Sequence, residues 1–447
     1  MKKTRFSHLT AFILAGALSG YAGTASAAGF AVNTPSAQSM GNATAGGGAV
    51  AEDASTVWFN PASMTRLPSQ MMASAHVLLP NFEFTDKGST LPIPPATPIS
   101  GPTTSDGGTN AIAPNFYYIR TLNERWSFGL AVNAPFGLAT EYDNNWKGRY
   151  HAIDSEIVDF NLNPALAYKV NEVFSVGAGV SVNYIDAKLT NVVDFATICA
   201  VNALPCAGPS GTLDGFAENN ADDISFGFNF GVFYEPRDGT RFSLAYRSQI
   251  NHKLEGDADF TVPAAALPFL GPVFTDGGIK VGASLPDTFS FSAFHMLTPK
   301  IGIMGDATWT GWSDIPELRI VYDSPTNGGG SGTSVESLGW EDVWRLALGL
   351  SYYHSDRLTL RTGVAYDQSP VPNPVLATPR LPDNDRIWVS IGASYAINDK
   401  ASVDFAYTHE FIDDTNIART NSTGATLNGV YESSVDIFSL QANYRFD

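Results

Sequence analysis

A long alternation of apolar and polar residues constrains this chain more than any other feature. From about residue 70 to the C-terminus, segments in which every second residue is apolar follow one another. The clearest of them has an apolar face formed by Ile224, Phe226, Phe228, Phe230, Val232 and Tyr234. Small or polar residues occupy its other face, with Phe233 as an exception. An apolar face turned outward and a small or polar face turned inward are what a transmembrane β-barrel requires.

The number of such segments is about fourteen, and single-chain bacterial barrels have an even number of strands. Short polar turns alternate along the chain with long loops rich in Gly, Pro and Asp. We therefore expect an all-β fold, a transmembrane antiparallel β-barrel of about 14 strands with both chain ends on the periplasmic side. The expected strands are residues 70–84, 111–120, 125–136, 155–170, 173–191, 223–235, 241–254, 279–296, 300–322, 339–353, 357–367, 385–397, 401–412 and 430–446.

The N-terminus has the features of an export signal. Lys2, Lys3 and Arg5 precede a short apolar stretch at residues 11–18, and residues 25–27 fit an A-x-A cleavage site. This pattern predicts a signal peptide over residues 1–27. The apolar stretch is too short to be a membrane-spanning helix, which needs about 20 apolar residues. Export combined with barrel alternation predicts the outer membrane of a Gram-negative cell.

Composition excludes several classes of function. The formal net charge of −18 argues against a nucleic-acid partner. The chain has only 7 His residues, and none lies in a cluster with metal-ligand spacing. We expect no enzyme activity, no cofactor and no metal site.

The two cysteines, Cys199 and Cys206, lie close together in one long loop. Exported proteins form disulfides in an oxidising compartment, so a local disulfide is the favoured interpretation. Two free thiols are the alternative. No His lies nearby in sequence, which argues against a catalytic thiol.

Period-two alternation also assigns charged residues to the lumen. Because Trp344 and Leu346 belong to an apolar face, the intervening Arg345 faces inward. The same argument places Arg247, Arg361 and Arg386 inside the barrel, since a charge on the lipid face is destabilising. An interior ladder of salt bridges is the favoured role for these residues, and direct binding of substrate is the alternative.

The residues before the first strand lack the membrane-strand pattern. This part of the chain, residues 28–68, is rich in small residues but contains Trp58 and Phe59, which a disordered leader would not need. An empty pore of about fourteen strands would be wide enough to leak. We expect residues 28–68 to form a plug, or hatch, inside a barrel of residues 69–447. Gly363 is expected to face the lumen away from the third strand, where replacement by Val would have a milder effect than at Gly137.

Short motifs spread over the mature chain resemble those of the outer-membrane long-chain fatty-acid transporter family (FadL-type), which also includes aromatic hydrocarbon transporters. Each motif is weak by itself, but their order and spacing together are specific. The matching stretches are Ala28-Gly29-Phe30, Asn60-Pro61-Ala62, Phe136-Gly137-Leu138-Ala139-Thr140-Glu141, Tyr246-Arg247-Ser248, Leu285-Pro286, Arg345-Leu346-Ala347-Leu348-Gly349, Ser369-Pro370-Val371-Pro372, Leu381-Pro382-Asp383-Asn384-Asp385-Arg386 and Lys400-Ala401-Ser402-Val403-Asp404.

The resemblance implies passive uptake of a hydrophobic small molecule with sideways exit into the membrane. It places the plug and gate at Phe30 and at Asn60-Pro61-Ala62, and the lateral exit at a kink in the third strand, at Phe136 and Gly137. It also implies that the Asn60-Pro61-Ala62 segment lies against this kink. The residues support a break there independently, because Pro135 removes a ladder donor and a Gly in a strand often marks a bend. The implied partners are the substrate, outer-membrane lipid and lipopolysaccharide, and the implied state is a monomer.

One part of the family pattern is missing. The family's two basic carboxylate-binding positions align with Asn191 and Glu336 in this chain. A buried carboxylate without a cation is costly, so Lys188, Arg247 or another basic group would have to substitute. Otherwise the substrate is an uncharged aromatic or aliphatic hydrocarbon rather than a long-chain fatty acid. A general porin or an adhesin is the more distant alternative.

Overall fold

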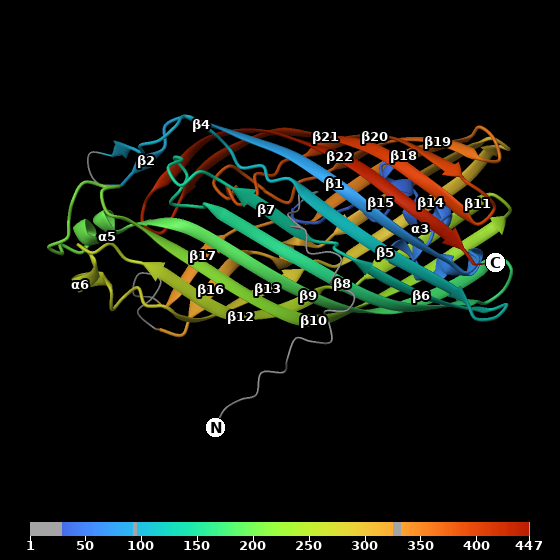
Figure 1. The fold of residues 1–447 in the computed structure, drawn as a ribbon, viewed down its shortest axis with the longest axis horizontal. Helices are drawn as coiled ribbons and strands as arrows, with labels where there is room; N and C mark the ends of the chain where they lie inside the picture. The colour runs from blue at the N-terminus through green and yellow to red at the C-terminus, as the bar shows by residue number, and fades with distance from the viewer. Residues whose placement is uncertain (1–28, 93–95, 325–331, 447) are drawn as a thin grey trace, which may run out of the picture.

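The structure is a computed structural model that describes residues 29–92, 96–324 and 332–446. It contains one antiparallel sheet that closes on itself into a long barrel (Figure 1). β1 (Gln70–Asp86) pairs along its length with β22 (Thr426–Arg445), and this pairing joins the first span to the last. On its other edge β1 pairs with β5 (Ala111–Thr121). The pairing of β1 with β22 closes the sheet, which confirms the expected all-β barrel.

The wall consists of 14 spans, as the sequence predicts. The spans made of one strand are β1, β5, β8 (Asp154–Lys169), β9 (Phe174–Asp194), β10 (Asp214–Arg237), β19 (Leu358–Asp367), β20 (Arg386–Ala396), β21 (Ala401–Thr420) and β22. The spans made of two strands in line are β6 (Trp126–Asn133) with β7 (Gly137–Glu141), β11 (Thr240–Arg247) with β12 (Ile250–Thr261), β13 (Gly277–Leu285) with β14 (Thr288–Thr298), β15 (Ile301–Thr310) with β16 (Glu317–Tyr322), and β17 (Thr333–Ser337) with β18 (Val343–Tyr353).

These divided spans correct the expectation of continuous strands at 241–254, 279–296 and 300–322. Pro286 supplies no N–H group to the ladder between β13 and β14. A 3₁₀ helix, η2 (Trp312–Asp314), separates β15 from β16. Side-chain alternation continues across such breaks, so the sequence pattern does not reveal them.

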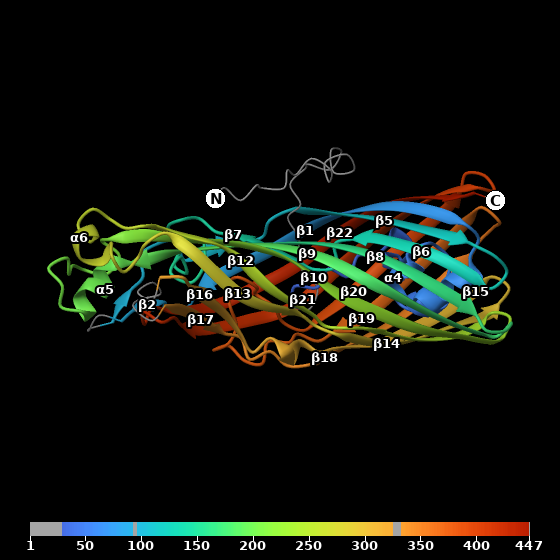
Figure 2. The ribbon, with the colours of Figure 1, turned by 90° about the horizontal axis from the view of Figure 1, so that it is seen from below.

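The two ends of the barrel differ (Figures 1 and 2). Short turns and the C-terminus lie at one end, which we call the turn end. The other, the loop end, carries α5 (Phe195–Val201), α6 (Leu267–Leu270), β2 (Thr90–Leu91), β3 (Thr97–Pro98) and β4 (Thr104–Asp106). In the part of the chain that the structure describes, no helix has the length and apolarity needed to cross a membrane.

The expected loops 192–222 and 413–429 are partly wrong. β9 runs on to Asp194 and β10 starts at Asp214, and β21 and β22 extend to within a few residues of each other. Polar residues replace apolar ones on the outer face of the β10 extension, for example Asp222, which pairs with Asp186 of β9. The extensions therefore lack the lipid-facing pattern, although their backbone remains paired.

Side chains along the wall point alternately outward and inward, as the sequence pattern predicts. Trp344, Leu346 and Leu348 are exposed on the outer surface, whereas Arg345 is buried on the inner side. Outward apolar side chains recur on the neighbouring strands, as at Phe226 of β10. Their shared direction forms the apolar band that lipid requires.

The lumen is occupied by the chain preceding β1, which we call the N-terminal segment (residues 29–69). It folds into short helices, α2 (Ala37–Met40), α3 (Gly47–Val50), α4 (Thr56–Phe59) and η1 (Pro61–Arg66). These helices contact strands on opposite sides of the barrel, from β6, β8, β9 and β10 to β20, β21 and β22, and they lie toward the turn end (Figure 2). The expected signal peptide, residues 1–27, lies outside the described residues, and the division into plug and barrel units stays a prediction.

Candidate functional site

The third span is broken at residues 134–136, which we call the kink. β6 ends at Asn133 and β7 starts at Gly137. The N-terminal segment pairs with this break: Val32 N donates to Pro135 O at 2.7 Å, and Gly137 N donates to Phe30 O at 2.8 Å. The bonds flank Ala31 and Phe136, which face each other as a bridge. Residues 30–32 thus act as a short strand that completes the sheet where the wall is interrupted.

A series of hydrogen-bonded polar side chains on the wall strands fixes the backbone of the kink. Phe136 N donates to Asp159 Oδ2 at 3.1 Å, and Asn183 Nδ2 donates to Asp159 Oδ1 at 2.5 Å. His252 continues the chain, with 2.8 Å between its Nε2 and Asn183 Oδ1 and 2.9 Å between its Nδ1 and Asp223. The Asp159 carboxylate replaces a ladder bond that the kink lacks, so it positions Phe136.

Aromatic rings gather around the start of the N-terminal segment. Phe30 lies 5.7 Å from Phe136, 5.0 Å from Trp312 and 5.8 Å from Trp340, between ring centroids. Gly29 N donates to Asp383 Oδ2 at 2.9 Å. Aromatic pairs at these distances contribute beyond their buried area. The rings hold the segment against the kink.

The Asn60-Pro61-Ala62 motif is anchored elsewhere, which corrects the expectation that it lies against the kink. Asn60 Nδ2 donates to Val232 O at 2.9 Å and to Ser243 Oγ at 2.7 Å. A Cβ at Gly177 would lie 2.5 Å from Ala62 N, so the motif packs directly on bare backbone of β9. The hydrogen bonds to the kink come from residues 30–32, which sequence reasoning could assign only by analogy.

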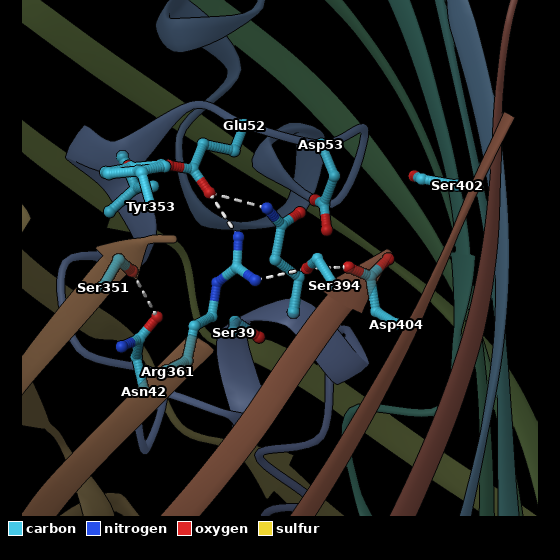
Figure 3. Close-up of polar contacts among 12 residues, drawn as sticks. Ser39, Asn42, Glu52, Asp53, Ser351, Tyr353, Arg361, Ser394, Ser402 and Asp404 are labelled. Atoms are coloured by element: carbon cyan, nitrogen blue, oxygen red, sulfur yellow. Dashed lines mark hydrogen bonds and ion pairs between the residues drawn. The ribbon is translucent and has the colours of Figure 1, made fainter. Parts of the chain in front are cut away.

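Polar contacts tie the N-terminal segment to the opposite wall (Figure 3). Glu52 of the segment forms an ion pair with Arg361 at 2.8 Å and accepts a hydrogen bond from Tyr353 at 2.6 Å. Asn42 Nδ2 donates to Leu350 O at 2.9 Å, and its Oδ1 accepts from Ser351 at 3.3 Å. These contacts join β18 and β19 to the segment.

Gly363 lies at this same anchor, which argues against the expected milder effect of a larger side chain there. A Cβ at Gly363 would overlap the carbonyl of Asn42 and lie 2.8 Å from Ala43 N. The backbone of the N-terminal segment occupies that space. The glycine is therefore needed for close approach of two backbones.

The kink and the N-terminal segment enclose a cavity of about 130 Å³, which we call the luminal cavity. Val32 and Pro61 of the segment, Pro135 and Phe136 of the kink, and Arg247 of β11 all line it. Pro61 of the Asn60-Pro61-Ala62 motif thus lines the same cavity as the kink, although the hydrogen bonds of the motif are made elsewhere.

A larger cavity of about 830 Å³, the outer cavity, lies at the loop end. Its charged lining includes Asp194 and a cluster of Arg380, Arg419 and Glu336, in which Glu336 lies 3.3 Å from Arg380 and 3.4 Å from Arg419. His151 also lines it, and burial lowers the pKa of His151 to about 4, with Glu336 opposing the shift. The cluster therefore carries two positive charges, one negative charge and a neutral imidazole near pH 7. Its apolar lining is Leu189, Val192, Phe260, Ile320 and Tyr322.

The basic residues expected in the lumen are placed differently from one another. Arg345 lies 3.7 Å from Asp306, and Arg386 pairs with Asp383 and with Glu410, so both take part in interior ion pairs. The structure corrects the expected position of Lys188, which does not face the lumen. It lies on the outer face of β9, with its ammonium 3.0 Å from Asp154, because its parity matches that of the outward Asp186.

Sequence reasoning missed Arg380 and Arg419. Arg380 belongs to a loop without period-two alternation, and Arg419 lies beyond the expected end of its strand at residue 412. No local sequence pattern predicts whether the side chain of a loop residue points into the lumen. Glu336, aligned with a basic family position, lies between these two arginines, whereas Asn191 lines the cavity beside them.

Cys199 and Cys206 are joined by a disulfide, with their Cα atoms 5.5 Å apart. The bridge closes α5 and the turn that follows it at the loop end. Both cysteines are buried against Phe195 and Leu270. The disulfide thus fixes the tip of the β9–β10 hairpin.

Known proteins resemble the chain in sequence. A long-chain fatty acid transport protein of Salmonella typhi is 30% identical over 398 residues, which cover 86% of this chain and 87% of that protein. A 47 kDa outer membrane protein of Pasteurella multocida is 31% identical over 459 residues, covering 100% of both chains.

Solved structures agree with these relatives. A FadL homologue of Pseudomonas aeruginosa superposes with a TM-score of 0.85 at 26% identity, covering 94% of this chain and 100% of the homologue. The toluene transporter TodX of P. putida shares the fold, with a TM-score of 0.67 at 16% identity over 88% of this chain and 94% of TodX. Residues 18–446 match the family described as outer membrane protein transport protein (OMPP1/FadL/TodX), and the chain belongs to that family.

Proposed function

We propose that this protein carries long-chain fatty acids across the outer membrane by passive diffusion, with lateral exit at the kink. Its relatives of nearly equal length include long-chain fatty acid transport proteins. An apolar solute gains free energy by entering lipid rather than water, so the route needs no energy source and no chemical step at this membrane. Uncharged hydrocarbons are the second candidate, because the family's basic positions are Asn191 and Glu336 here.

The orientation we propose places the loop end outside the cell and both ends of the mature chain on the periplasmic side. Barrels of this class have short periplasmic turns and longer extracellular loops. The β22 C-terminus and the start of β1 lie together at the turn end, where Phe446 N donates to Ser69 O at 3.0 Å. We further propose a monomer whose loop end is surrounded by lipopolysaccharide, with the outer cavity as the first protein site that the substrate meets.

Capture in the outer cavity rests on its charge and size. Arg380 and Arg419 share one carboxylate, Glu336, which leaves one positive charge in excess within this cluster, beside an apolar lining. Asp194 also lines the cavity, and its carboxylate accepts a hydrogen bond from Thr197 N. Its volume of about 830 Å³ is typical of sites for small molecules. A fatty-acid carboxylate would satisfy the excess charge, and the acyl chain would contact the apolar lining.

Lateral exit rests on one observation above the others. The only strand that pairs with the kink from inside the lumen, within the described residues, belongs to the N-terminal segment. Movement of residues 30–32 would uncover a break in the wall and leave the barrel ladder itself intact. We propose that this movement opens the route from the luminal cavity to the membrane.

A disulfide lock tests the proposal. Ala31 and Phe136 face each other as a non-hydrogen-bonded antiparallel pair, for which the Cα separation is about 4.5 Å. This separation lies in the range that a disulfide spans. We would prepare Ala31→Cys with Phe136→Cys in a chain whose native cysteines are replaced by Ser. Oxidation is expected to stop palmitate uptake, and reduction is expected to restore it on the same protein.

The matched control is Phe136→Cys alone, which loses the same aromatic ring but has no partner thiol. Its uptake is expected to be unaffected by oxidant. Palmitate uptake at the same rate before and after complete oxidation of the double variant would rule out exit at the kink. Uptake of hexane or toluene by the native protein, without any uptake of palmitate, would favour the hydrocarbon alternative.

A further inference from the structure

Within residues 29–92, 96–324 and 332–446, Arg247 differs from Arg345 and Arg361 in having no carboxylate partner. It is the last residue of β11 and lines the luminal cavity. Among the described residues, no Asp or Glu oxygen lies within the 4.0 Å ion-pair limit of its guanidinium. Taking an unpaired charge out of water is costly. The position therefore suits an anion that arrives from elsewhere.

Two other inward-facing arginines, Arg345 and Arg361, are already paired. Arg361 lies 2.8 Å from Glu52, and Arg345 lies 3.7 Å from Asp306 and 4.0 Å from Asp367. Arg345 lines the same luminal cavity as Arg247. Of these two cations, only Arg247 has its charge free of an internal carboxylate.

Arg247 is also held in a fixed direction. Its guanidinium carbon lies 3.5 Å from the ring centroid of Trp58, so the planar group stacks on the indole. One terminal nitrogen donates to Trp58 O at 2.9 Å and the other donates to Ser181 Oγ at 3.1 Å. These neutral acceptors orient the group and leave its positive charge uncompensated. An arginine with further N–H groups in a planar fork is suited to bind a carboxylate.

We propose that Arg247 is a second binding site for the carboxylate of the substrate, inside the lumen and on the same cavity as the kink. The inference rests on the proposed function and adds a transfer point between the outer cavity and the membrane. Pro135, Phe136 and Val32 line the cavity together with Arg247. With the carboxylate held there, the alkyl chain is the part of the molecule free to enter the opening at the kink.

Two probes of equal chain length separate charge from chain. Palmitate and hexadecanol differ only at the head group, and palmitate is ionised at pH 8. We would measure the uptake of both by outer-membrane vesicles that contain Arg247→Met, a substitution that keeps an apolar stem against Trp58. Hydrogen bonds to a charged group are worth enough for a drop of about tenfold or more in the ratio of palmitate to hexadecanol uptake. Arg247→Lys is expected to restore part of that ratio, because it keeps the charge.

Lys188→Met is the matched control, since it removes a positive charge from the outer face of the wall. Its uptake ratio is expected to equal that of the native protein. If Arg247→Met lowers the uptake of both probes equally, Arg247 serves only to hold Trp58 and the inference is wrong. An unchanged ratio with unchanged uptake also overturns it. If the native protein takes up neither probe, the proposed function fails, which is a separate result.

Discussion

Adding a single methyl group at Gly363 should open a leak through the barrel. The Cβ of Gly363→Ala would overlap the Asn42 carbonyl and lie 2.8 Å from Ala43 N, whereas ordinary contact begins at 3.4 Å. The backbone there must therefore move by more than 0.6 Å, which is the difference between these two distances, because the Asn42 carbonyl lies closer still to the added Cβ. A shift of this kind strains the bonds from Asn42 Nδ2 to Leu350 O and Thr362 O, which are 2.9 Å and 3.1 Å long.

The expected magnitude follows from overpacking and from these hydrogen bonds. Overpacking costs about 1–3 kcal/mol. Loss of one or two hydrogen bonds costs about 1 kcal/mol each. A total of about 2–5 kcal/mol raises the population of barrels with a displaced N-terminal segment between about thirtyfold and a few thousandfold, at 1.4 kcal/mol for each factor of ten.

Ion conductance in planar bilayers measures this population directly, since a displaced segment opens the lumen to water. Gly282→Ala is the matched control, because Gly282 lies in β13 with no heavy atom within 4 Å of the added Cβ. We expect frequent large openings for Gly363→Ala and native behaviour for Gly282→Ala. Equal conductance of the two variants would refute the view that close backbone contact at β19 holds the segment in place.

Four further outcomes are expected. Gly137→Val should leave substrate bound but not delivered, because Gly137 starts β7 against Phe30, and a native rate of uptake would argue against exit there. Asp159→Ala should change the rate at which the Cys pair at positions 31 and 136 oxidises, since Asp159 fixes the kink backbone. An unchanged oxidation rate would show that Asp159 does not position the kink. Without reductant, the thiols of Cys199 and Cys206 should resist alkylation, as mass spectrometry would reveal, and the bridge should stabilise the loop by about 2–3 kcal/mol in the chain-entropy model. Protease cleavage of the loop around His151 should increase as the pH falls from about 6.5 toward 4, and His151→Gln should reduce this dependence.

The sign of the last prediction follows from the direction of the pKa shift. Burial lowers the pKa of His151 from 6.5 to about 4, so the unfolded loop binds the proton more readily than the folded loop. The loop thus has its full stability above about pH 6.5 and loses stability below it. Cleavage that is equally pH-dependent in His151→Gln would assign the effect to other groups.

The lipid-facing part of the barrel could be read from the sequence because lipid imposes a strict period of two. Outward Phe226 and Leu348 and inward Arg345 and Arg361 were placed correctly by parity alone. The same rule failed where lipid no longer constrains the chain, at the extensions of β9 and β10 beyond the apolar band. The rule did not predict the breaks between strands at Pro286 and η2, since a break in pairing does not disturb the alternation of side chains.

The sequence by itself determined the barrel, the approximate number of spans, the inward direction of most arginines and the break at Pro135, because each depends on local backbone chemistry or on burial in lipid. Only the tertiary structure decided which groups meet inside the lumen. It placed residues 30–32 on the kink, Asn60 on β10 and β11, and Arg380 and Arg419 around Glu336. These contacts join residues far apart in sequence, and they depend on strand register and on the path of the N-terminal segment, neither of which a local pattern specifies.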